Sequence, residues 1–342
     1  MLKPLRFITV IAVFVHALWA CTDSGYNDAL PAKTEKEITV IFEPGGWGDG
    51  GYNDLIYKGL ISALSDGKLT DTKVKYYNPS NVLEAENIIS QWKADTLSTN
   101  KKLLVLASSS YRETLHEMFD VSPVDTARQH ILFFESDDVN MEGVSTFNIS
   151  MYGVSYIAGS VTAQLSLKPT VALGNSSDSV LTHAADGFCD GFADADTTNF
   201  QVSRVSLSDS NDGYDMADSA YVCMFDWCKS CNLVFPVMGG SIMGVFRYIR
   251  EYPVHLYTVG VDVDQSDLCH NIVGNMLKHI DVVFKNYLEK WAAGYPLPRA
   301  ATYGLGAGYT EWKPSFELEE YNINLNEIKA QAIKKENEYE GI

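Results

Sequence analysis

The sequence predicts an α/β protein of two lobes, each built on a parallel sheet with helices on both faces. Three observations lead to this prediction. Short β-branched and apolar runs alternate with stretches of helical period, and about 10–15 helical residues separate successive runs, as in βαβ units. The alternation pauses near residues 148–151 and then restarts. The 342 residues are 46% hydrophobic and 20% charged, a composition that suits one large or two medium globular domains.

The first series begins at Ile38–Phe42, whose β-branched residues favour a strand. After a glycine-rich turn, apolar residues at helical spacing predict a helix over Asn53–Leu64. The same reasoning predicts strands at Lys73–Tyr77, Leu103–Ala107 and Ile131–Phe134, and helices at Asn81–Lys93, Glu113–Phe119 and Tyr152–Leu165.

The second series begins with the short strand Thr170–Leu173. It continues with helices at Val180–Ala193, Tyr214–Trp227 and Gly244–Glu251, and with strands at Phe200–Ser206, Leu233–Val237 and Leu256–Val261. Two lobes of this kind place a small-ligand cleft between them, at the carboxyl ends of the strands.

The N-terminus is typical of a secretory signal. Lys3 and Arg6 precede the apolar run Phe7–Ala20, which is too short to span a bilayer comfortably. Leu18-Trp19-Ala20-Cys21 resembles a bacterial lipobox, and the resemblance implies that residues 1–20 are removed and Cys21 is acylated, for example by palmitate. Residues 21–37 then form a tether between the lipid and the folded protein. The alternative is a buried N-terminal helix. No second long apolar run follows.

The chain is strongly acidic. With 26 Lys+Arg against 44 Asp+Glu, the formal charge is 26 − 44 = −18. Removing residues 1–20 takes away two positive charges, so the mature chain carries 24 − 44 = −20. A ligand held through a phosphate backbone needs clustered Lys and Arg, so nucleic acid is excluded as a partner.

The glycine-rich segment Gly46–Gly51 matches the G-x-G-x-x-G pattern, but it differs from a dinucleotide site. Glu43 and Pro44 separate it from the strand, and the carboxylates of Glu43 and Asp49 would repel a pyrophosphate. A P-loop is excluded because no Gly-Lys-Ser/Thr follows. Two interpretations stay open: the carboxylates accept hydrogen bonds from a hydroxyl-bearing or cationic ligand, or Asp49 or Asn53 caps a tight turn.

Five cysteines follow Cys21, and two of them form a C-x-x-C pair. They are Cys189, Cys223, Cys228, Cys231 and Cys269. In an oxidising compartment one or two disulfides are the favoured arrangement, with at least one thiol left over. Buried inert thiols are the alternative. We expect no metal site, because the sequence offers no convincing fourth ligand.

An enzyme is the second class of protein to consider. No H-E-x-x-H or G-x-S-x-G motif is present. Glu43 and Asp49 could form an acid/base pair for glycoside or nucleoside hydrolysis, which would need one raised pKa. We expect a protein without catalytic activity and without a cofactor.

Six blocks in the same order resemble the basic membrane lipoprotein family. They are Glu43–Asn53 with Gly59, Gly153–Gly159, Asp186–Phe188 with Gly191, Leu233–Gly240 with Gly244–Phe246, Val259–Gln265, and Met276–Lys278 heading a helix with Asp281. The resemblance implies a type I periplasmic-binding-protein fold, in which two Rossmann-like lobes with parallel sheets are joined by a hinge.

The family resemblance also implies a domain division and a function. We expect an N-terminal lobe from residues 38–149 plus about 270–300, and a C-terminal lobe from 150–269 plus about 301–342. Characterised relatives of this kind are monomeric, lipid-anchored solute-binding proteins that deliver purine nucleosides to an ABC permease. A surface receptor that uses the same cleft as a sensor is the alternative.

The resemblance implies ligand contacts from both lobes. Tyr52 and Phe235 would sandwich a flat base between two rings. From the first lobe, Glu43, Asp49 and Asn53 would bond base or sugar groups. Stacking of this kind suits a heterocycle better than an aliphatic ligand.

The remaining implied contacts come from the second series of elements. Gly239 and Gly240 would let the backbone approach the ligand closely, because glycine has no Cβ. Asp262 matches a carboxylate that binds the ribose hydroxyls, and Lys278 matches a lysine that donates to the sugar or balances that carboxylate. The chain departs from the family pattern at Tyr52, where the family has Phe.

Overall fold

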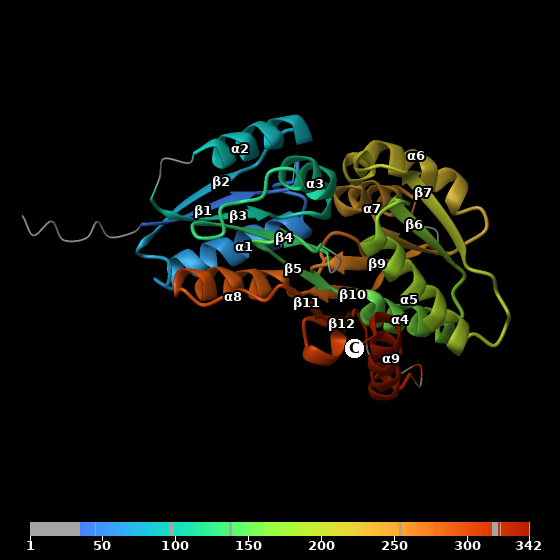
Figure 1. Cartoon of the computed structure of the whole chain (residues 1–342). Coiled ribbons are helices and arrows are strands. Elements are labelled where there is room, and N and C mark those ends of the chain that lie inside the picture. Colours follow the sequence, from blue (N-terminus) through green and yellow to red (C-terminus); the bar gives the residue numbers. More distant parts are fainter. Residues whose placement is uncertain are drawn as a thin grey trace, which may run out of the picture. The chain divides into compact units, whose positions relative to one another are not determined.

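The structure is a computed structural model that describes residues 35–44, 46–95, 99–136, 139–252, 255–316, 321 and 323–341. Its two six-stranded sheets confirm the predicted α/β fold class (Figure 1). The elements are β1 (Lys36–Ile41), α1 (Tyr52–Ser65), β2 (Thr72–Tyr77), α2 (Val82–Ala94), β3 (Lys101–Leu106), α3 (Arg112–Phe119), β4 (Gln129–Phe134), β5 (Val144–Ile149), α4 (Tyr152–Gln164), β6 (Pro169–Asn175), α5 (Ser179–Ala195), β7 (Ser203–Ser208), α6 (Ala217–Trp227), β8 (Leu233–Val237), α7 (Ile242–Glu251), β9 (Tyr257–Asp262), β10 (Ile272–Lys278), α8 (Ile280–Ala292), β11 (Ala300–Tyr303), β12 (Thr310–Pro314) and α9 (Leu325–Glu340). Short 3₁₀ turns are η1 (Ser109–Tyr111), η2 (Asn211–Asp215), η3 (Gly239–Ser241) and η4 (Leu305–Ala307).

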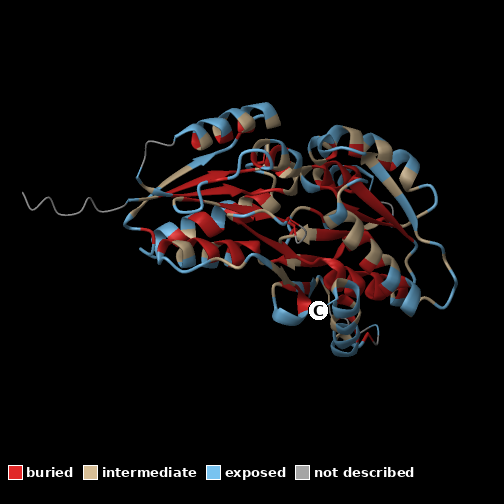
Figure 2. Ribbon diagram, in the orientation of Figure 1, coloured by how far each residue is buried: buried red, intermediate tan, exposed pale blue. Residues whose placement is uncertain are grey.

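The first sheet has the strand order β11-β5-β4-β3-β1-β2, and all its neighbouring strands run parallel. Helices α1 and α8 cover one face through a buried cluster that includes Leu60 and Phe284. Helices α2 and α3 cover the other face through a cluster that includes Trp92 and Leu115. Because helices cover both faces, the central strands are apolar along most of their length and appear as buried arrows in Figure 2.

The second sheet has the order β12-β10-β9-β8-β6-β7. Its strands are parallel except for β12, which runs antiparallel to β10. Helices α4, α5 and α9 pack on one face, where Phe188 and Ala332 share a buried cluster. Helices α6 and α7 pack on the other face around Met224 and Phe246. The two lobes therefore repeat one three-layer design.

Three crossovers join the lobes. The chain passes from β5 to α4, from β10 to α8, and from β11 to β12. Two of the crossovers are hydrogen-bonded to each other, because the N–H of Ser150 donates to the carbonyl of Tyr303 at 2.7 Å. The chain stays in the second lobe from α4 to the end of β10. It returns to the first lobe for α8 and β11, and it crosses for the third time after Tyr303.

The structure corrects three expectations. Residues from about 270 onward were expected in the first lobe, but β10 completes the second sheet between β9 and β12. Met276–Lys278 was expected to head a helix, whereas it ends this strand. Lys36 and Glu37 were assigned to the tether, but they begin β1 and pair with β2 and β3.

Two expectations concern residues outside the described part of the chain. They are the signal peptide of residues 1–20 and the acylated Cys21, together with most of the tether. Among the residues that the structure does describe, no helix has the length and apolar character needed to cross a membrane.

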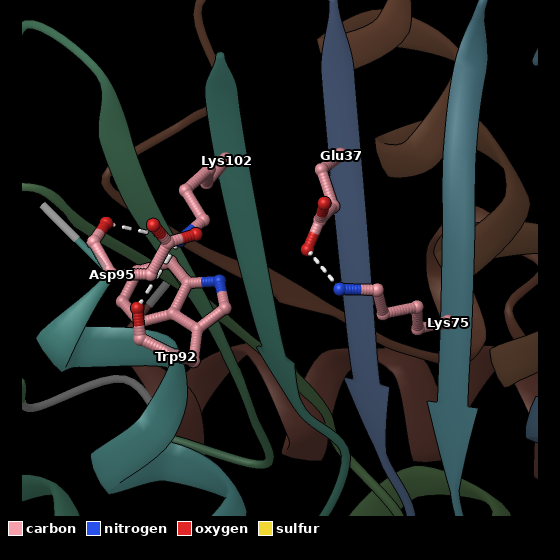
Figure 3. Close-up of polar contacts among 5 residues, drawn as sticks. All are labelled: Glu37, Lys75, Trp92, Asp95 and Lys102. Carbon is pink, nitrogen blue, oxygen red and sulfur yellow. Dashed lines mark hydrogen bonds and ion pairs between the residues drawn. The ribbon is translucent and has the colours of Figure 1, made fainter. Parts of the chain in front are cut away.

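Charged pairs lie in the first sheet away from the carboxyl ends of its strands (Figure 3). Lys102, the second residue of β3, is 3% exposed and pairs with Asp95 at 2.6 Å. Its Nζ also donates to the carbonyl of Trp92 at 3.3 Å. Glu37 of β1 pairs with Lys75 of β2 at 2.8 Å. Asp95 and Glu37 thus each have a lysine partner.

Helices α4 and α5 cross at glycines. A Cβ on Gly191 would lie 2.0 Å from the carbonyl oxygen of Tyr156, and a Cβ on Gly159 would lie 2.0 Å from that of Phe188. Both distances are far below any tolerable contact. Gly159 and Gly191, which belong to the blocks that resemble the family, are therefore explained by backbone-to-backbone packing within the second lobe.

The substitution Gly191→Ala is expected to lower the free energy of unfolding by about 1–3 kcal/mol, because α5 must move away from α4. Urea denaturation measures the loss. Ala193→Ser changes an exposed position two residues along the same helix and should cost less than about 0.5 kcal/mol. Equal effects from the two variants would contradict the close crossing.

Candidate functional site

A cavity lies between the lobes at the carboxyl ends of their strands. The empty space within it is about 640 Å³, a figure that includes space open to solvent. A wider hollow adjoins it and shares Glu43, Tyr52, Tyr214 and Gly239 with it. We name the two parts the inner cavity and the outer cleft.

Eight of the nine expected ligand-binding residues line these two spaces. Glu43, Tyr52 and Gly239 line both, Asp262 and Lys278 line the inner cavity, and Asp49, Asn53 and Gly240 line the outer cleft. Residues more than 200 positions apart in the chain are thereby brought to one site.

Phe235 is the exception and corrects the expected aromatic sandwich. It lies in the middle of β8, is fully buried, and stacks on Phe188 with ring centroids 4.4 Å apart and planes 14° apart. Its ring belongs to the core of the second lobe and does not line the inner cavity or the outer cleft. The aromatic ring that the second lobe contributes is Tyr214, in the turn η2. We had expected Tyr214 to begin a helix, but α6 starts three residues later.

Glu43 follows β1 and accepts two hydrogen bonds on one oxygen. The hydroxyls of Ser108 and Ser110 donate to its Oε1 at 3.0 and 2.7 Å. Burial raises the pKa of this carboxyl, and the two serine hydroxyls partly offset that effect. Its second oxygen receives no hydrogen bond from either serine. Ser108 and Ser110, which follow β3, therefore hold Glu43 in place at the cavity wall.

Asp49 stabilises the glycine-rich loop in which it lies. Its carboxylate accepts from the backbone N–H of Gly51 at 2.8 Å and of Asn53 at 2.9 Å, and from the side-chain amide of Asn53 at 3.1 Å. This is the capped turn that was one of the two open interpretations of the glycine-rich segment. Asn53 is 3% exposed, and its Oδ1 has no hydrogen-bond partner among the described residues.

Lys278 forms a buried ion pair with Glu135, a residue that we had not expected at the site. Their side chains are 3% and 4% exposed, and Nζ lies 2.6 Å from Oε1. Lys278 ends β10 and Glu135 follows β4, so the pair connects the two lobes. Burial raises the pKa of Glu135 although Lys278 opposes the shift. The sequence did not single out Glu135, because only the fold brings it to Lys278.

Asp262 ends β9 with an unusual backbone. Its φ is +67°, in the left-handed region that most residues avoid. Burial raises the pKa of its carboxyl to about 6, Lys278 lowers it, and Asp49 and Glu135 raise it further. The strained backbone directs an unneutralised carboxylate at the inner cavity. Strain retained at a cavity wall is typical of a binding residue.

Asp178 bridges the lobes and is a second residue that the sequence did not single out. It caps α5 by accepting from the N–H of Val180 at 2.8 Å. Its other oxygen accepts from Ser109 of the first lobe at 2.9 Å and from the Tyr214 hydroxyl at 2.5 Å. From the sequence alone, an aspartate before a helix is interpreted as an ordinary N-cap. Its role between the lobes depends on the tertiary structure.

Gly239 and Gly240 let the chain pass closely over Tyr214. Gly239 has a φ of +53°, and a Cβ there would meet the Tyr214 side chain at 3.3 Å. A Cβ on Gly240 would lie 3.3 Å from the Tyr214 carbonyl and 3.9 Å from Asp49 of the first lobe. The two glycines therefore bring the lobes together at the mouth of the cleft.

The five cysteines in the described part of the chain are free thiols, which differs from the one or two disulfides that we expected. The Sγ of Cys228 contacts the Tyr248 hydroxyl at 3.3 Å, and that of Cys231 donates to the carbonyl of Trp227 at 3.1 Å. The C-x-x-C pair thus packs at the end of α6. Within the described residues, no group of three or more His, Cys, Asp or Glu side chains is arranged to hold a metal ion.

A cavity between two α/β lobes joined by three crossovers is the architecture of a bilobal protein that binds small molecules. Residues 36–339 match the Bmp family, described as ABC transporter substrate-binding protein PnrA-like. The chain belongs to this family and is a substrate-binding protein of the ABC-transporter type. The family resemblance noted in the sequence is confirmed.

Solved structures show the same fold at low sequence identity. A solute-binding protein of an ABC transporter system from Aeropyrum pernix K1 has a TM-score of 0.65 and 16% identity, over 89% of this chain and 86% of that one. A transcriptional activator of the comK gene from Bacillus halodurans has a TM-score of 0.63 and 16% identity, over 87% and 97%. The glucose-galactose binding protein GanP from Geobacillus stearothermophilus has a TM-score of 0.60 and 13% identity, over 82% and 98%. A search of curated proteins found no match.

Proposed function

We propose that the protein is the lipid-anchored binding component of an ABC importer, and that it holds a purine nucleoside in the inner cavity. The observation that carries the proposal is the polar chemistry of the cavity wall. Two tyrosines, Tyr52 and Tyr214, lie beside the carboxylates of Glu43 and Asp262. Aromatic rings suit a flat base, and a carboxylate can accept two adjacent hydroxyls of a ribose.

The charge balance of the cavity favours a ligand without phosphate. Glu43, Glu135, Asp178 and Asp262 line it together with a single cation, Lys278, which is already paired with Glu135. A phosphate group would meet three further carboxylates at short range, which is unfavourable in a partly buried site. A nucleoside instead offers hydroxyl and amino donors to those carboxylates.

The proposal includes anchoring and delivery. An acylated Cys21 would hold the protein at the outer side of a bacterial membrane, where the tether lets the monomer meet a permease. Ligand contacts from both lobes would favour the closed form over an open one, and the closed form would dock. Mass spectrometry of the N-terminal peptide of the mature protein checks the acylation at Cys21.

Titration calorimetry of the full chain purified in detergent tests the ligand. We expect at least one of adenosine, guanosine and inosine to bind with a dissociation constant near or below about 1 μM. Free base, ribose and the matching 5′-monophosphate should bind at least about 100-fold more weakly, because each lacks part of the contact set or adds negative charge. Binding of sugars or amino acids alone would exclude a nucleoside ligand. Release of free base during the titration would place the protein among hydrolases.

A further inference from the structure

The Tyr52 hydroxyl stands apart from the other side-chain hydroxyls that line the inner cavity. Those of Ser108, Ser109 and Tyr214 each donate to a carboxylate of the cavity wall. The Tyr52 hydroxyl is shielded from solvent and has no hydrogen-bond partner among the described residues. A buried hydroxyl without a partner destabilises the folded protein, so its retention at a cavity wall calls for a reason.

The surroundings of Tyr52 fix the hydroxyl as a donor. Burial, together with the nearby carboxylates of Glu135, Glu43 and Asp262, raises its pKa well above the usual value of a tyrosine. The hydroxyl therefore keeps its proton at neutral pH and can act as a hydrogen-bond donor. The ring is held from one side by Lys278, whose Nζ lies 5.2 Å from the ring centroid.

We infer that the Tyr52 hydroxyl determines specificity by donating a hydrogen bond to an acceptor atom of the ligand, such as a ring nitrogen or a carbonyl oxygen. The inference rests on the proposed function, since it concerns a ligand in the same cavity. Around this donor the wall presents mainly carboxylate acceptors, so the matching ligand carries donors over most of its edge and one acceptor opposite Tyr52. An analogue without that acceptor leaves the hydroxyl unpaired in the complex as well.

Calorimetry on Tyr52→Phe with a set of nucleoside analogues tests the inference. The set replaces one acceptor at a time, as in the 1-deaza, 3-deaza and 7-deaza purine nucleosides and an analogue without the exocyclic oxygen. The wild-type protein should bind one of these about tenfold more weakly than the parent nucleoside. Tyr52→Phe should bind the parent about tenfold more weakly and should no longer distinguish it from that one analogue.

Tyr57→Phe is the matched control, because Tyr57 lies on the same helix α1 but is 36% exposed and outside the inner cavity. It should leave every affinity unchanged. If Tyr52→Phe weakens all analogues by the same factor, or none of them, the inference is overturned, since the hydroxyl then serves the protein alone. If no nucleoside binds the wild-type protein, the proposed function fails, and this result is separate from the comparison of variants.

Discussion

Replacing Lys278 by methionine is expected to lower the free energy of unfolding by about 3–5 kcal/mol at neutral pH, because it removes one partner of a buried ion pair. Lys278 and Glu135 are 3% and 4% exposed and lie 2.6 Å apart. Methionine keeps the length and the apolar stem of the side chain. The loss therefore reflects the Glu135 carboxylate, left without its cation beside Glu43, Asp178 and Asp262.

The deficit of Lys278→Met should depend on pH. Burial already raises the pKa of Glu135, and loss of the cation raises it further. A group whose pKa is higher in the folded protein favours folding below its unfolded pKa, and this contribution is lost as the pH rises through the folded pKa. The deficit should therefore be large at pH 8 and shrink toward pH 4. Urea denaturation at both pH values measures it.

Two further variants separate charge from packing. Adding Glu135→Gln to Lys278→Met removes the buried charge and should recover most of the lost stability. Lys229→Met breaks an exposed pair, with side chains 72% and 80% exposed, and should change stability by less than about 1 kcal/mol. A Lys278→Met effect no larger than that of Lys229→Met would show that the buried pair does not have the assigned role.

Asp262→Asn is expected to stabilise the ligand-free protein and to weaken ligand binding. Burial raises the pKa of Asp262 to about 6, so its ionised form destabilises the fold above that pH. A neutral asparagine tolerates the same left-handed backbone and should raise the free energy of unfolding by about 2 kcal/mol at pH 8. The affinity for the nucleoside should fall at least about tenfold, since a charged acceptor is lost.

The stability gain expected from Asp262→Asn should also depend on pH. Below the unfolded pKa of an aspartate, about 4, Asp262 is protonated in both states and the gain from Asp262→Asn should vanish. Denaturation and calorimetry on the same samples give both quantities. A variant that is less stable at pH 8, or that binds as tightly as the wild type, would contradict the assignment.

Asp264→Asn is the control two residues away. The hydrogen bond from Lys313 holds the pKa of Asp264 at about 2, and its side chain is 37% exposed. This group stabilises the fold when ionised, so its replacement should lower stability slightly. It should leave the affinity unchanged, because Asp264 does not line the inner cavity.

The sequence located much of the site, but it assigned one side chain wrongly. Asp262 and Glu43 were expected from the family resemblance, and both lie at the carboxyl ends of strands, which meet at one edge of a parallel sheet. Phe235 was placed in the cleft by family resemblance, although it lies within the strand β8, where every residue is buried. Whether a ring in such a strand faces the core or the ligand depends on the helix packed against it, here Phe188 of α5.

The sequence did not identify two other residues of the inner cavity, Asp178 and Tyr214, as site residues. Asp178 looks like an ordinary helix cap, and Tyr214 lies in a turn next to a helical stretch. The strands β5, β10, β11 and β12 were not predicted. In β5, Ser145, Thr146 and Asn148 interrupt the apolar run. These residues are buried by the neighbouring strands β4 and β11, and β11 arrives from about 150 residues further along the chain.

The sequence by itself determined the α/β class, the two series of strands and helices, the family resemblance and the acidic character of the chain. These follow from local period, composition and short motifs, which need no knowledge of distant contacts. Only the tertiary structure decided that Lys278 pairs with Glu135, that Tyr214 lines the cavity in place of Phe235, and that the Tyr52 hydroxyl has no hydrogen-bond partner in the described part of the chain. The ion pair depends on residues from different lobes, and the position of Phe235 depends on Phe188 of α5 in its own lobe. Their spacing is set by the three crossovers and by close glycine packing, which no local pattern records.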